Sequence, residues 1–527
     1  MLRLRTLSFA ARVHSRALRI LAADPVDPCC AETFADAGHK LVEKKMAHAE
    51  LLASISNYEG LVVRSGVKVT ADIIAAGKKL RIIGRAGAGV DNIDTAAATR
   101  HGVLVMNTPG GNTSAAAELT LSLLMNMARA IPAACAALKD GKWERKLFSA
   151  GTELKGKTIG IVGLGMIGAE VARHCRALGM KTIAFDPVVS VDTASAMGIE
   201  KATLDQIWAQ SDFITVHTPL NDATKNLICA ATLKKCKQGV FIINAARGGI
   251  INEADLLASL KAGHVRGAAI DVYESEPPTS AVTKELIAHP AVVCTPHLGA
   301  STEEAQKKVA REIAAQMSDA FEGKAFVGVV NSPFIALAHK PAFAPFVKLA
   351  EALGALQGQI AFTPESLRVL GQPLKGTTVR VDVEGPALQE RGFSELTLAS
   401  VLKGMLPVIP RLDFSADAVN LINAPFVARD TGVTVNVKSS ATSSSSAFAN
   451  AIKVTVTNAE GERVAVGAVI EGVPRIVQLD HWSSFPTFAP KGHVLLWNNI
   501  DAPGQVSRVA QVLAVRPDCR VCPHSRS

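Results

Sequence analysis

The chain has 527 residues, of which 48% are hydrophobic and 20% are charged, so at roughly one domain per 100 to 200 residues we expect about three or four domains. Its formal net charge is +9, but residues 1–23 contribute +5 and residues 505–527 contribute +3, which leaves only +1 between them. A near-neutral body argues against a groove for nucleic acid. The apolar runs are also shorter than the ~18 residues that a membrane span needs, so no membrane segment is predicted.

The first 16 residues carry four arginines beside Leu, Phe, Ser and Thr and contain no acid. This composition is typical of a mitochondrial presequence, and a disordered basic extension is the alternative interpretation. The nine cysteines are scattered, mostly in apolar segments, as reduced thiols are, and Cys519 and Cys522 form a C-x-x-C with no second pair at zinc spacing. We therefore expect a cytoplasmic protein, with mitochondrial import as the alternative, and no metal site.

Short apolar runs alternate with helical stretches between residue 17 and residue 107. This rhythm predicts a parallel sheet covered by helices. The segment 112–129 then predicts one long apolar helix, and the polar stretch 139–157 interrupts the pattern. The predicted strands lie in ALRILAAD, KLVE, GLVVRS, LRIIGRAG and GVLVMN.

A second alternating block begins at residue 158 and has the spacing of a doubly wound nucleotide-binding sheet. One long helix over 301–323 follows, with Ser301 and Glu304 as its capping box, and such a helix can carry the chain back to the first block. We therefore predict one domain over 110–296 and another formed by 17–109 with 297–330. The six predicted strands lie in TIGIVG, KTIAFD, FITVHTP, VFIINAARGG, VRGAAIDVY and AVVCTPH.

The remaining sequence differs in texture, with more Pro and Phe and alternating runs such as TTVRVDVEG and AIKVTVTNAEG. These features predict a separate α+β domain over 331–490. The segment 491–527 begins like a strand, a turn and a helix and ends in a short Arg/Cys/Pro tail.

A glycine-rich turn directly follows the first strand of the second block. Gly163, Gly165 and Gly168 open the helix AEVARHCRALG, and Asp186 ends the next strand. Glycines let the backbone approach a pyrophosphate, the helix N-terminus supplies oriented N–H groups, and the acid can accept hydrogen bonds from ribose hydroxyls. Because an acid there repels a 2′-phosphate, the motif predicts NAD binding.

Three polar residues stand at or just beyond strand ends of the same block: Arg247, Glu276 and His297. Each alone has an ordinary interpretation, as a salt-bridge partner, a solvated acid or a helix cap. Together they suit hydride transfer at a hydroxyl carbon. His297 can take the hydroxyl proton, Glu276 can hydrogen-bond its other ring nitrogen, and Arg247 can bind a substrate carboxylate.

The motifs GLGMIG, HTPL, NAARGG, DVYESEP and PHLGAS together resemble the D-2-hydroxyacid dehydrogenase family. The resemblance covers about 17–335 and implies an α/β fold with a Rossmann NAD domain, a flavodoxin-like substrate domain and a C-terminal α+β appendage. It implies that Arg247, Glu276 and His297 are the catalytic triad. The implied cofactor-binding residues are Gly163, Gly165, Met166, Ile167, Gly168, Asp186, Thr218, Ala245, Arg247, Asp271, His297 and Gly299.

The segments VVRSGVKVTADII, GRAGAGVDNID, VLVMNTPGGNTSAAAELT and LKDGKWERKLF are more similar to the phosphoglycerate dehydrogenases within that family. This implies NAD-dependent oxidation of 3-phospho-D-glycerate to 3-phosphohydroxypyruvate, the first step of L-serine biosynthesis, by a homo-dimer or homo-tetramer. Two departures are Ala88, where some relatives carry Thr, and the C-terminus, which resembles only the start of a regulatory ACT domain. The implied substrate contacts are Arg64, Arg85, Gly87, Gly89 and Asn112, with Arg145 from a second subunit.

Two other functions remain open on the sequence. A reductase for glyoxylate or hydroxypyruvate has the same scaffold, although arginines placed for a phosphate argue against it. An NAD-sensing corepressor shares the fold and the triad but acts by binding peptides. Turnover of the phosphorylated acid, measured beside that of D-glycerate, would separate the three.

Overall fold

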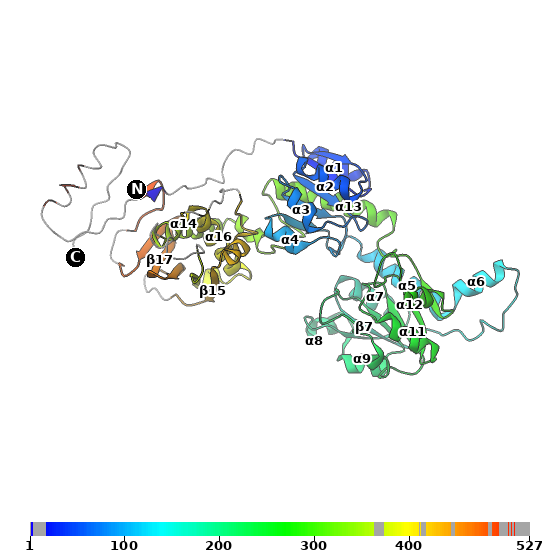
Figure 1. Ribbon diagram of the computed structural model, residues 1–527. Helices are drawn as coiled ribbons and strands as arrows, with labels where there is room; N and C mark the ends of the chain where they lie inside the picture. Colours follow the sequence, from blue (N-terminus) through cyan, green and yellow to red (C-terminus); the bar gives the residue numbers. More distant parts are fainter. Residues whose placement is uncertain are drawn as a thin grey trace. The chain divides into compact units, whose positions relative to one another are not determined.

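The computed structural model describes residues 2–3, 17–362, 374–410, 412, 418–443, 448–482, 487–494, 504, 507–508 and 511. The chain divides into two compact units, Met1–Asn107 with Arg311–Ser527, and Thr108–Ala310 (Figure 1). Most of the predicted basic extension (1–16) and of the segment 491–527, including Cys519 and Cys522, lies outside the described residues. Of these segments, the structure describes two short strands that pair antiparallel, β1 (Leu2–Arg3) and β19 (His493–Val494).

The first sheet has five parallel strands in the order β3-β2-β4-β5-β6. This is the order of flavodoxin-like doubly wound sheets, and all five strands coincide with predicted runs. All four residues of β4 are buried, as expected where helices cover both faces. The elements are β2 (Arg19–Ala22), α1 (Cys29–Asp36), β3 (Lys40–Glu43), α2 (His48–Ser54), η1 (Ile55–Asn57), β4 (Gly60–Val63), α3 (Ala71–Ala76), β5 (Ile82–Arg85), α4 (Thr95–Arg100) and β6 (Leu104–Asn107).

The long helix α13 (Glu303–Phe321) returns the chain to this first sheet. Its Ile313 and Met317 pack against Gly84 so closely that a Cβ on that glycine would lie 2.2 Å from Met317 Sδ. The predicted capping box of Ser301 and Glu304 is wrong. Thr302 caps the helix instead, because its Oγ1 accepts the Ala305 N–H at 3.1 Å while its carbonyl closes the first helical turn.

The second unit contains a seven-stranded parallel sheet in the order β13-β12-β11-β10-β7-β8-β9. This is the Rossmann order, with the direction of winding reversing between β7 and β10. The six predicted strands are present, and β9, only two residues long, was not predicted. The elements are α5 (Thr113–Ala128), α6 (Ile131–Lys139), β7 (Thr158–Val162), α7 (Met166–Ala177), β8 (Lys181–Phe185), α8 (Val191–Ala196), β9 (Glu200–Lys201), α9 (Leu204–Gln210), β10 (Phe213–Val216), α10 (Ala230–Leu233), β11 (Val240–Asn244), α11 (Glu253–Lys261), β12 (Val265–Ile270), α12 (Ala281–Ala288) and β13 (Val292–Cys294).

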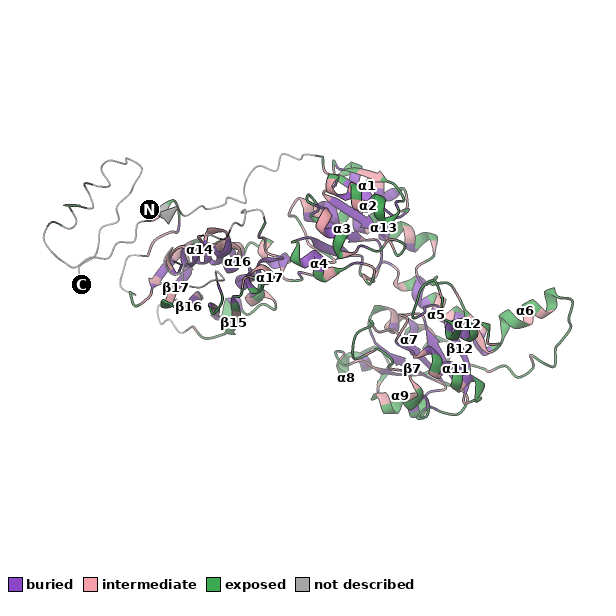
Figure 2. Cartoon of the chain, viewed as in Figure 1, coloured by how far each residue is buried: buried purple, intermediate pink, exposed green. Residues whose placement is uncertain are grey.

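Helix α5 packs into the core of this unit, whereas α6 buries none of its residues (Figure 2). Within the described residues, a bilayer-spanning length of apolar sequence is found in no single helix. Among the helices that the structure describes, α5 and α6 taken together reach that length and composition, and they meet at a bend of 65°.

The C-terminal part of the first unit holds a five-stranded mixed sheet in the order β15-β14-β16-β17-β18, in which only β14 and β15 are parallel. Helices α14 and α16 pack tightly because Gly354 and Gly404 let their backbones meet: a Cβ on Gly354 would lie 1.9 Å from the Val401 carbonyl oxygen. The elements are η2 (Ile335–His339), α14 (Ala344–Ile360), β14 (Thr378–Glu384), η3 (Pro386–Leu388), α16 (Phe393–Met405), η4 (Leu406–Val408), α17 (Ala424–Asp430), β15 (Thr434–Ser440), β16 (Ala451–Asn458), β17 (Gly461–Ile470) and β18 (Val473–Leu479).

Candidate active site

The candidate cofactor residues all lie at one edge of the seven-stranded sheet, just beyond the carboxyl ends of its strands. This is the edge at which open α/β sheets bind ligands. The structure therefore brings the whole predicted set to one side of the second unit. Gly163, Gly165, Met166, Ile167 and Gly168 follow β7, Asp186 follows β8, Thr218 follows β10, Ala245 and Arg247 follow β11, Asp271 follows β12, and His297 and Gly299 follow β13.

The turn between β7 and α7 has a shape that only glycine permits. Gly163 has φ 97°, and a Cβ on Gly168 would lie 2.0 Å from the Gly163 carbonyl oxygen. A Cβ on Gly165, by contrast, would meet nothing within 4 Å. The turn is thus compressed on its inner side and open at Gly165, the N-cap of α7, which suits a phosphate approaching the helix N-terminus.

Asp186 is joined to this turn by its carboxylate. One oxygen accepts the Leu164 N–H at 2.9 Å, and the other accepts the N–H groups of Val188 and Val189 at 2.8 and 3.1 Å. Partial burial opposes ionisation, but these amides and the charge of Lys201 outweigh it, so the pKa of Asp186 lies below its ordinary value. Asp186 is therefore an anion at neutral pH, which suits ribose hydroxyls and disfavours a 2′-phosphate.

Thr218 provides a further indication of a ligand at this edge. Its hydroxyl oxygen is buried and has no hydrogen-bond partner among the described residues. A buried hydroxyl is normally paired, so an unpaired one next to the glycine turn fits a group supplied by a bound molecule. The glycine turn, Asp186 and Thr218 together fit NAD.

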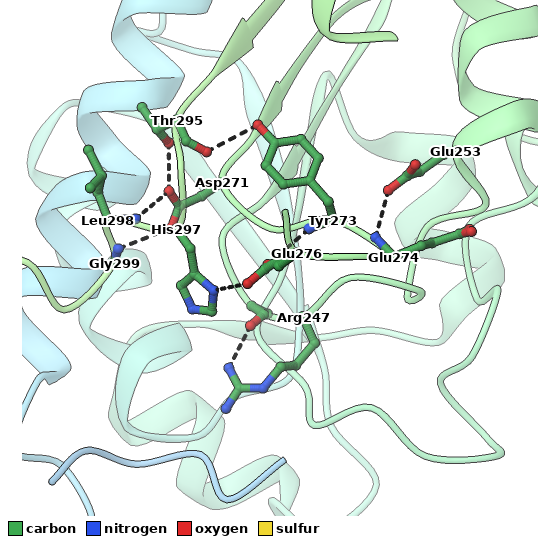
Figure 3. A network of polar contacts seen from close by, with 11 residues as sticks. Arg247, Glu253, Asp271, Tyr273, Glu274, Glu276, Thr295, His297, Leu298 and Gly299 are labelled. Carbon is green, nitrogen blue, oxygen red and sulfur yellow. Dashed lines mark hydrogen bonds and ion pairs between the residues drawn. The ribbon is translucent and has the colours of Figure 1, made fainter. Parts of the chain in front are cut away.

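His297 and Glu276 form an ion-pair geometry at the end of β13 (Figure 3). His297 Nδ1 lies 2.7 Å from Glu276 Oε2, and Glu276 Oε1 accepts the Tyr273 N–H at 3.1 Å. Partial burial favours the neutral acid, but His297, the Tyr273 amide and the charge of Arg247 together hold the pKa of Glu276 below its ordinary value. The hydrogen bond expected from the sequence is present, and it leaves Nε2 of the imidazole to face a substrate.

Asp271 holds the turn that carries His297. Its carboxylate accepts the Thr295 hydroxyl at 2.6 Å and the N–H groups of Leu298 and Gly299 at 2.7 and 3.0 Å, and its carbonyl accepts the His297 N–H at 2.9 Å. Burial raises the pKa of Asp271, although its hydrogen bonds and the charge of His297 favour the carboxylate. His297 is held at φ 55°, a conformation that costs a non-glycine residue about 1–3 kcal/mol. The hydrogen bonds between Asp271 and the turn offset this backbone strain.

Arg247 follows β11 in a turn organised by Asn244. The buried Asn244 side chain donates to the Arg247 carbonyl at 2.9 Å and accepts the Ala246 N–H at 3.0 Å. The Arg247 guanidinium donates to the Ala246 carbonyl at 2.6 Å. The guanidinium is therefore at the same sheet edge as the imidazole (Figure 3).

Glu253, the first residue of α11, braces the loop that carries Glu276. Its buried carboxylate accepts the Glu274 N–H at 2.8 Å and the Thr283 hydroxyl. The loop is thereby tied to both α11 and α12. Glu253, Asn244 and Thr295 were not predicted from the sequence. Of the three, Asn244 alone had a local signal, because it is a polar residue at the end of an apolar strand.

Four of the predicted substrate contacts lie in the other unit, at the carboxyl edge of the five-stranded parallel sheet. Arg64 directly follows β4 and Arg85 ends β5, and Val63 pairs with Arg85 in register. The Arg85 guanidinium lies over Gly87, because a Cβ there would be 1.6 Å from Arg85 Nη1. Gly87, at φ 141°, therefore presents its backbone beside the Arg85 guanidinium, and Gly89 follows two residues later in the same turn.

The last two predicted substrate contacts, Asn112 and Arg145, belong to the second unit. Asn112 is the N-cap residue of α5, and its carbonyl accepts the N–H of Ala116. The side chain of Ala116 lies beside Gly299. The start of α5 is therefore at the candidate cofactor edge. Arg145 lies in the exposed segment after α6.

Glu276→Gln tests the contact between Glu276 and His297. The amide keeps an oxygen near Nδ1 of the imidazole but loses the carboxylate, whose lowered pKa makes it an anion at neutral pH. A neutral amide stabilises the imidazolium that forms on proton transfer less well, so kcat for alcohol oxidation should fall by on the order of 10²-fold. Steady-state NADH formation measures this, and an unchanged kcat would show that Glu276 does not act through His297.

Comparisons with known proteins agree on one family. The D-isomer specific 2-hydroxyacid dehydrogenase NAD-binding domain matches residues 121–299, and the D-3-phosphoglycerate dehydrogenase intervening domain matches residues 342–480. D-3-phosphoglycerate dehydrogenase of Rattus norvegicus is 46% identical over 423 residues, covering 80% of this chain and 75% of the relative. That of Methanocaldococcus jannaschii is 37% identical over 500 residues, covering 94% and 90%.

A solved structure of a glyoxylate reductase from Paecilomyes thermophila is 28% identical, with a TM-score of 0.55, covering 60% of this chain and 98% of that chain. It supports the two-sheet α/β fold. The match at residues 342–480 is to a domain of D-3-phosphoglycerate dehydrogenases. The chain is therefore an NAD-dependent dehydrogenase that belongs to the D-3-phosphoglycerate dehydrogenase family.

Proposed function

We propose that the enzyme oxidises C2 of 3-phospho-D-glycerate to 3-phosphohydroxypyruvate, the first step of L-serine biosynthesis. The observation that carries this proposal is the hydrogen-bonded pair of His297 and Glu276, at the same sheet edge as Arg247 and the glycine turn. Membership of the D-3-phosphoglycerate dehydrogenase family supports the phosphorylated substrate. A glyoxylate or hydroxypyruvate reductase and a corepressor are less well supported.

In this proposal His297 Nε2 removes the proton of the C2 hydroxyl. Glu276 orients the ring through Nδ1 and stabilises the imidazolium that forms. Arg247 binds the substrate carboxylate and polarises the developing carbonyl. NAD, held by the Gly163–Gly168 turn, Asp186 and Thr218, supplies the hydride acceptor when bound. In the reverse reaction the protonated His297 returns the proton to the oxygen.

The experiment that tests this function measures NADH formation from 3-phospho-D-glycerate with coupled removal of the product, and D-glycerate is measured alongside. Turnover that favours the phosphorylated acid would support the proposal. Preference for D-glycerate would indicate the reductase. Tight NADH binding without turnover of either acid would indicate the corepressor.

We also propose that two or more copies of the chain associate through α6 and the segment that follows it. Trp143 and Leu147 are 81% and 70% exposed, and Ile131 and Leu138 are also exposed. Monomers rarely leave such a group of large apolar side chains in water. Arg145 lies in the same segment, so association would allow it to reach a site in a second copy.

Replacing Trp143 and Leu147 together by serine should therefore lower the oligomeric state, because it removes apolar area that only a second copy would cover. Light scattering after size-exclusion chromatography measures this directly. Val188→Ser, at an equally exposed position far along the chain, serves as the control. An unchanged mass for the double variant would contradict an interface at this segment.

A further inference from the structure

The loop 64–67, which carries Arg64 away from the end of β4, is held by two side chains from other loops. Asp24 comes two residues after the end of β2, and Asn92 comes from the segment before α4. Each of the two side chains bonds both ends of the loop. Asp24 accepts hydrogen bonds from N–H groups of the loop, and Asn92 donates hydrogen bonds to carbonyls of the loop.

The distances define a closed arrangement. Asp24 Oδ2 accepts the N–H groups of Arg64 and Val67 at 2.7 and 3.1 Å. Asn92 Nδ2 donates to the carbonyls of Arg64 and Val67 at 2.7 and 2.6 Å. Four backbone groups that no strand ladder pairs are thus bonded by one carboxylate oxygen and one amide nitrogen. Removing either side chain would leave two of these groups without their partner, which chains normally avoid.

The space around the loop is equally restricted. A Cβ on Gly66 would lie 2.7 Å from Asp24 Oδ1, so the loop rests directly on the carboxylate. Asp24 is only 7% exposed. The Arg64 guanidinium donates to the carbonyl of Pro25, the next residue, at 3.3 Å. The loop after β2 therefore restrains Arg64 both at its backbone and at the end of its side chain.

Arg64 and Arg85 follow or end neighbouring parallel strands, so two guanidinium groups belong to one stretch of the sheet edge. A phosphate monoester carries a charge of about −1.5 to −2 at neutral pH. Two guanidinium groups therefore suit a phosphate better than they suit a carboxylate. The phosphate is thus the group of the substrate that suits Arg64 and Arg85 by its charge.

We propose that Asp24 and Asn92 are positioning residues that fix Arg64 for the phosphate of the substrate. The inference rests on the proposed function. Because binding through Arg64 is equally strong before and during the chemical step, its loss should raise KM and leave kcat unchanged. A general loss of folded enzyme would instead lower the apparent kcat at constant KM.

The test uses isosteric variants on both sides of the loop, measured in the direction of 3-phosphohydroxypyruvate reduction by NADH. Asn92→Asp places a carboxylate against two carbonyls and should raise KM for 3-phosphohydroxypyruvate by about tenfold or more, with kcat and KM for NADH held within about twofold. Asp24→Ala should act similarly. Asp24→Asn keeps an oxygen acceptor and should recover most of that loss. Asn57→Ala, exposed at the amino-terminal side of β4, is the control.

A double-mutant cycle shows whether the effect passes through Arg64. In an Arg64→Ala background, Asn92→Asp should raise KM no further. An additive rise, an equal rise in KM for NADH, or an unchanged KM in both Asn92→Asp and Asp24→Ala would each overturn the positioning role. Wild-type enzyme that fails to reduce 3-phosphohydroxypyruvate would instead overturn the proposed function itself, so the two failures are distinguishable.

Discussion

His297→Ala should lower kcat for 3-phospho-D-glycerate oxidation by about 10²–10⁴-fold, the range that a general base supplies. The physical reason is the geometry at the end of β13. With Nδ1 bonded to Glu276 at 2.7 Å, the imidazole presents Nε2 to the hydroxyl. The measurement is steady-state NADH formation with coupled product removal.

NADH binding, followed by its fluorescence, is the control for this variant. His297 is only one of the candidate cofactor residues, and the glycine turn, Asp186 and Thr218 are kept in the variant, so the dissociation constant should rise by less than about tenfold. Alanine keeps the Cβ that causes the left-handed strain at φ 55° and so neither adds nor removes it, and the bonds between Asp271 and the Leu298 and Gly299 amides remain in the variant, so the fold should be kept. Retained turnover in His297→Ala would exclude this residue as the base.

Arg247→Ala should lower kcat/KM by on the order of 10³-fold, because the residue both binds the carboxylate and stabilises charge that develops on the reacting oxygen. Both kcat and KM should change, since only the first of these interactions is present before the transition state. Initial rates over a range of 3-phospho-D-glycerate concentrations separate the two constants. Arg247→Lys is the informative companion.

Lysine keeps the charge but loses the planar fork of donors, so Arg247→Lys should recover only part of the loss. The turn is expected to persist in both variants, because Asn244 bonds its backbone and not the guanidinium. Full recovery by lysine would mean that Arg247 acts as a point charge alone. An unchanged kcat in Arg247→Ala, with only KM raised, would remove the polarising role.

The sequence predicts the parallel sheets and the cofactor edge well, for a local reason. The runs TIGIV and VFIIN are apolar apart from the first residue of one and the last residue of the other, and in the structure β7 is buried except at its first residue and β11 throughout. Turns such as Gly163–Gly168 depend on residues a few positions apart, so their ligand-binding role can be predicted from the sequence. Elements with weaker local signals were not foreseen, including β9 and the exposed, partly polar strand β15.

The capping box of α13 shows how a local rule fails by one residue. Ser301 and Thr302 are equally good caps by type, and the backbone bond from Gln306 to the Thr302 carbonyl decides between them. The entry of the chain into the helix is set by the Asp271 carboxylate, which holds Leu298 and Gly299 from 27 and 28 residues away. Composition near the helix contains no trace of that constraint.

The sequence by itself determined the alternating α/β architecture, the glycine turn with Asp186, and the positions of Arg247, Glu276 and His297 at or just beyond strand ends, because each rests on residue type and on the local pattern around it. The tertiary structure alone decided how those residues are held: Asp271 under the His297 turn, Asn244 under Arg247, and Asp24 with Asn92 around Arg64. These bonds join residues 3 to 43 positions apart. Hydrogen bonds need partners within about 3 Å in space, and only the folded chain brings distant partners that close.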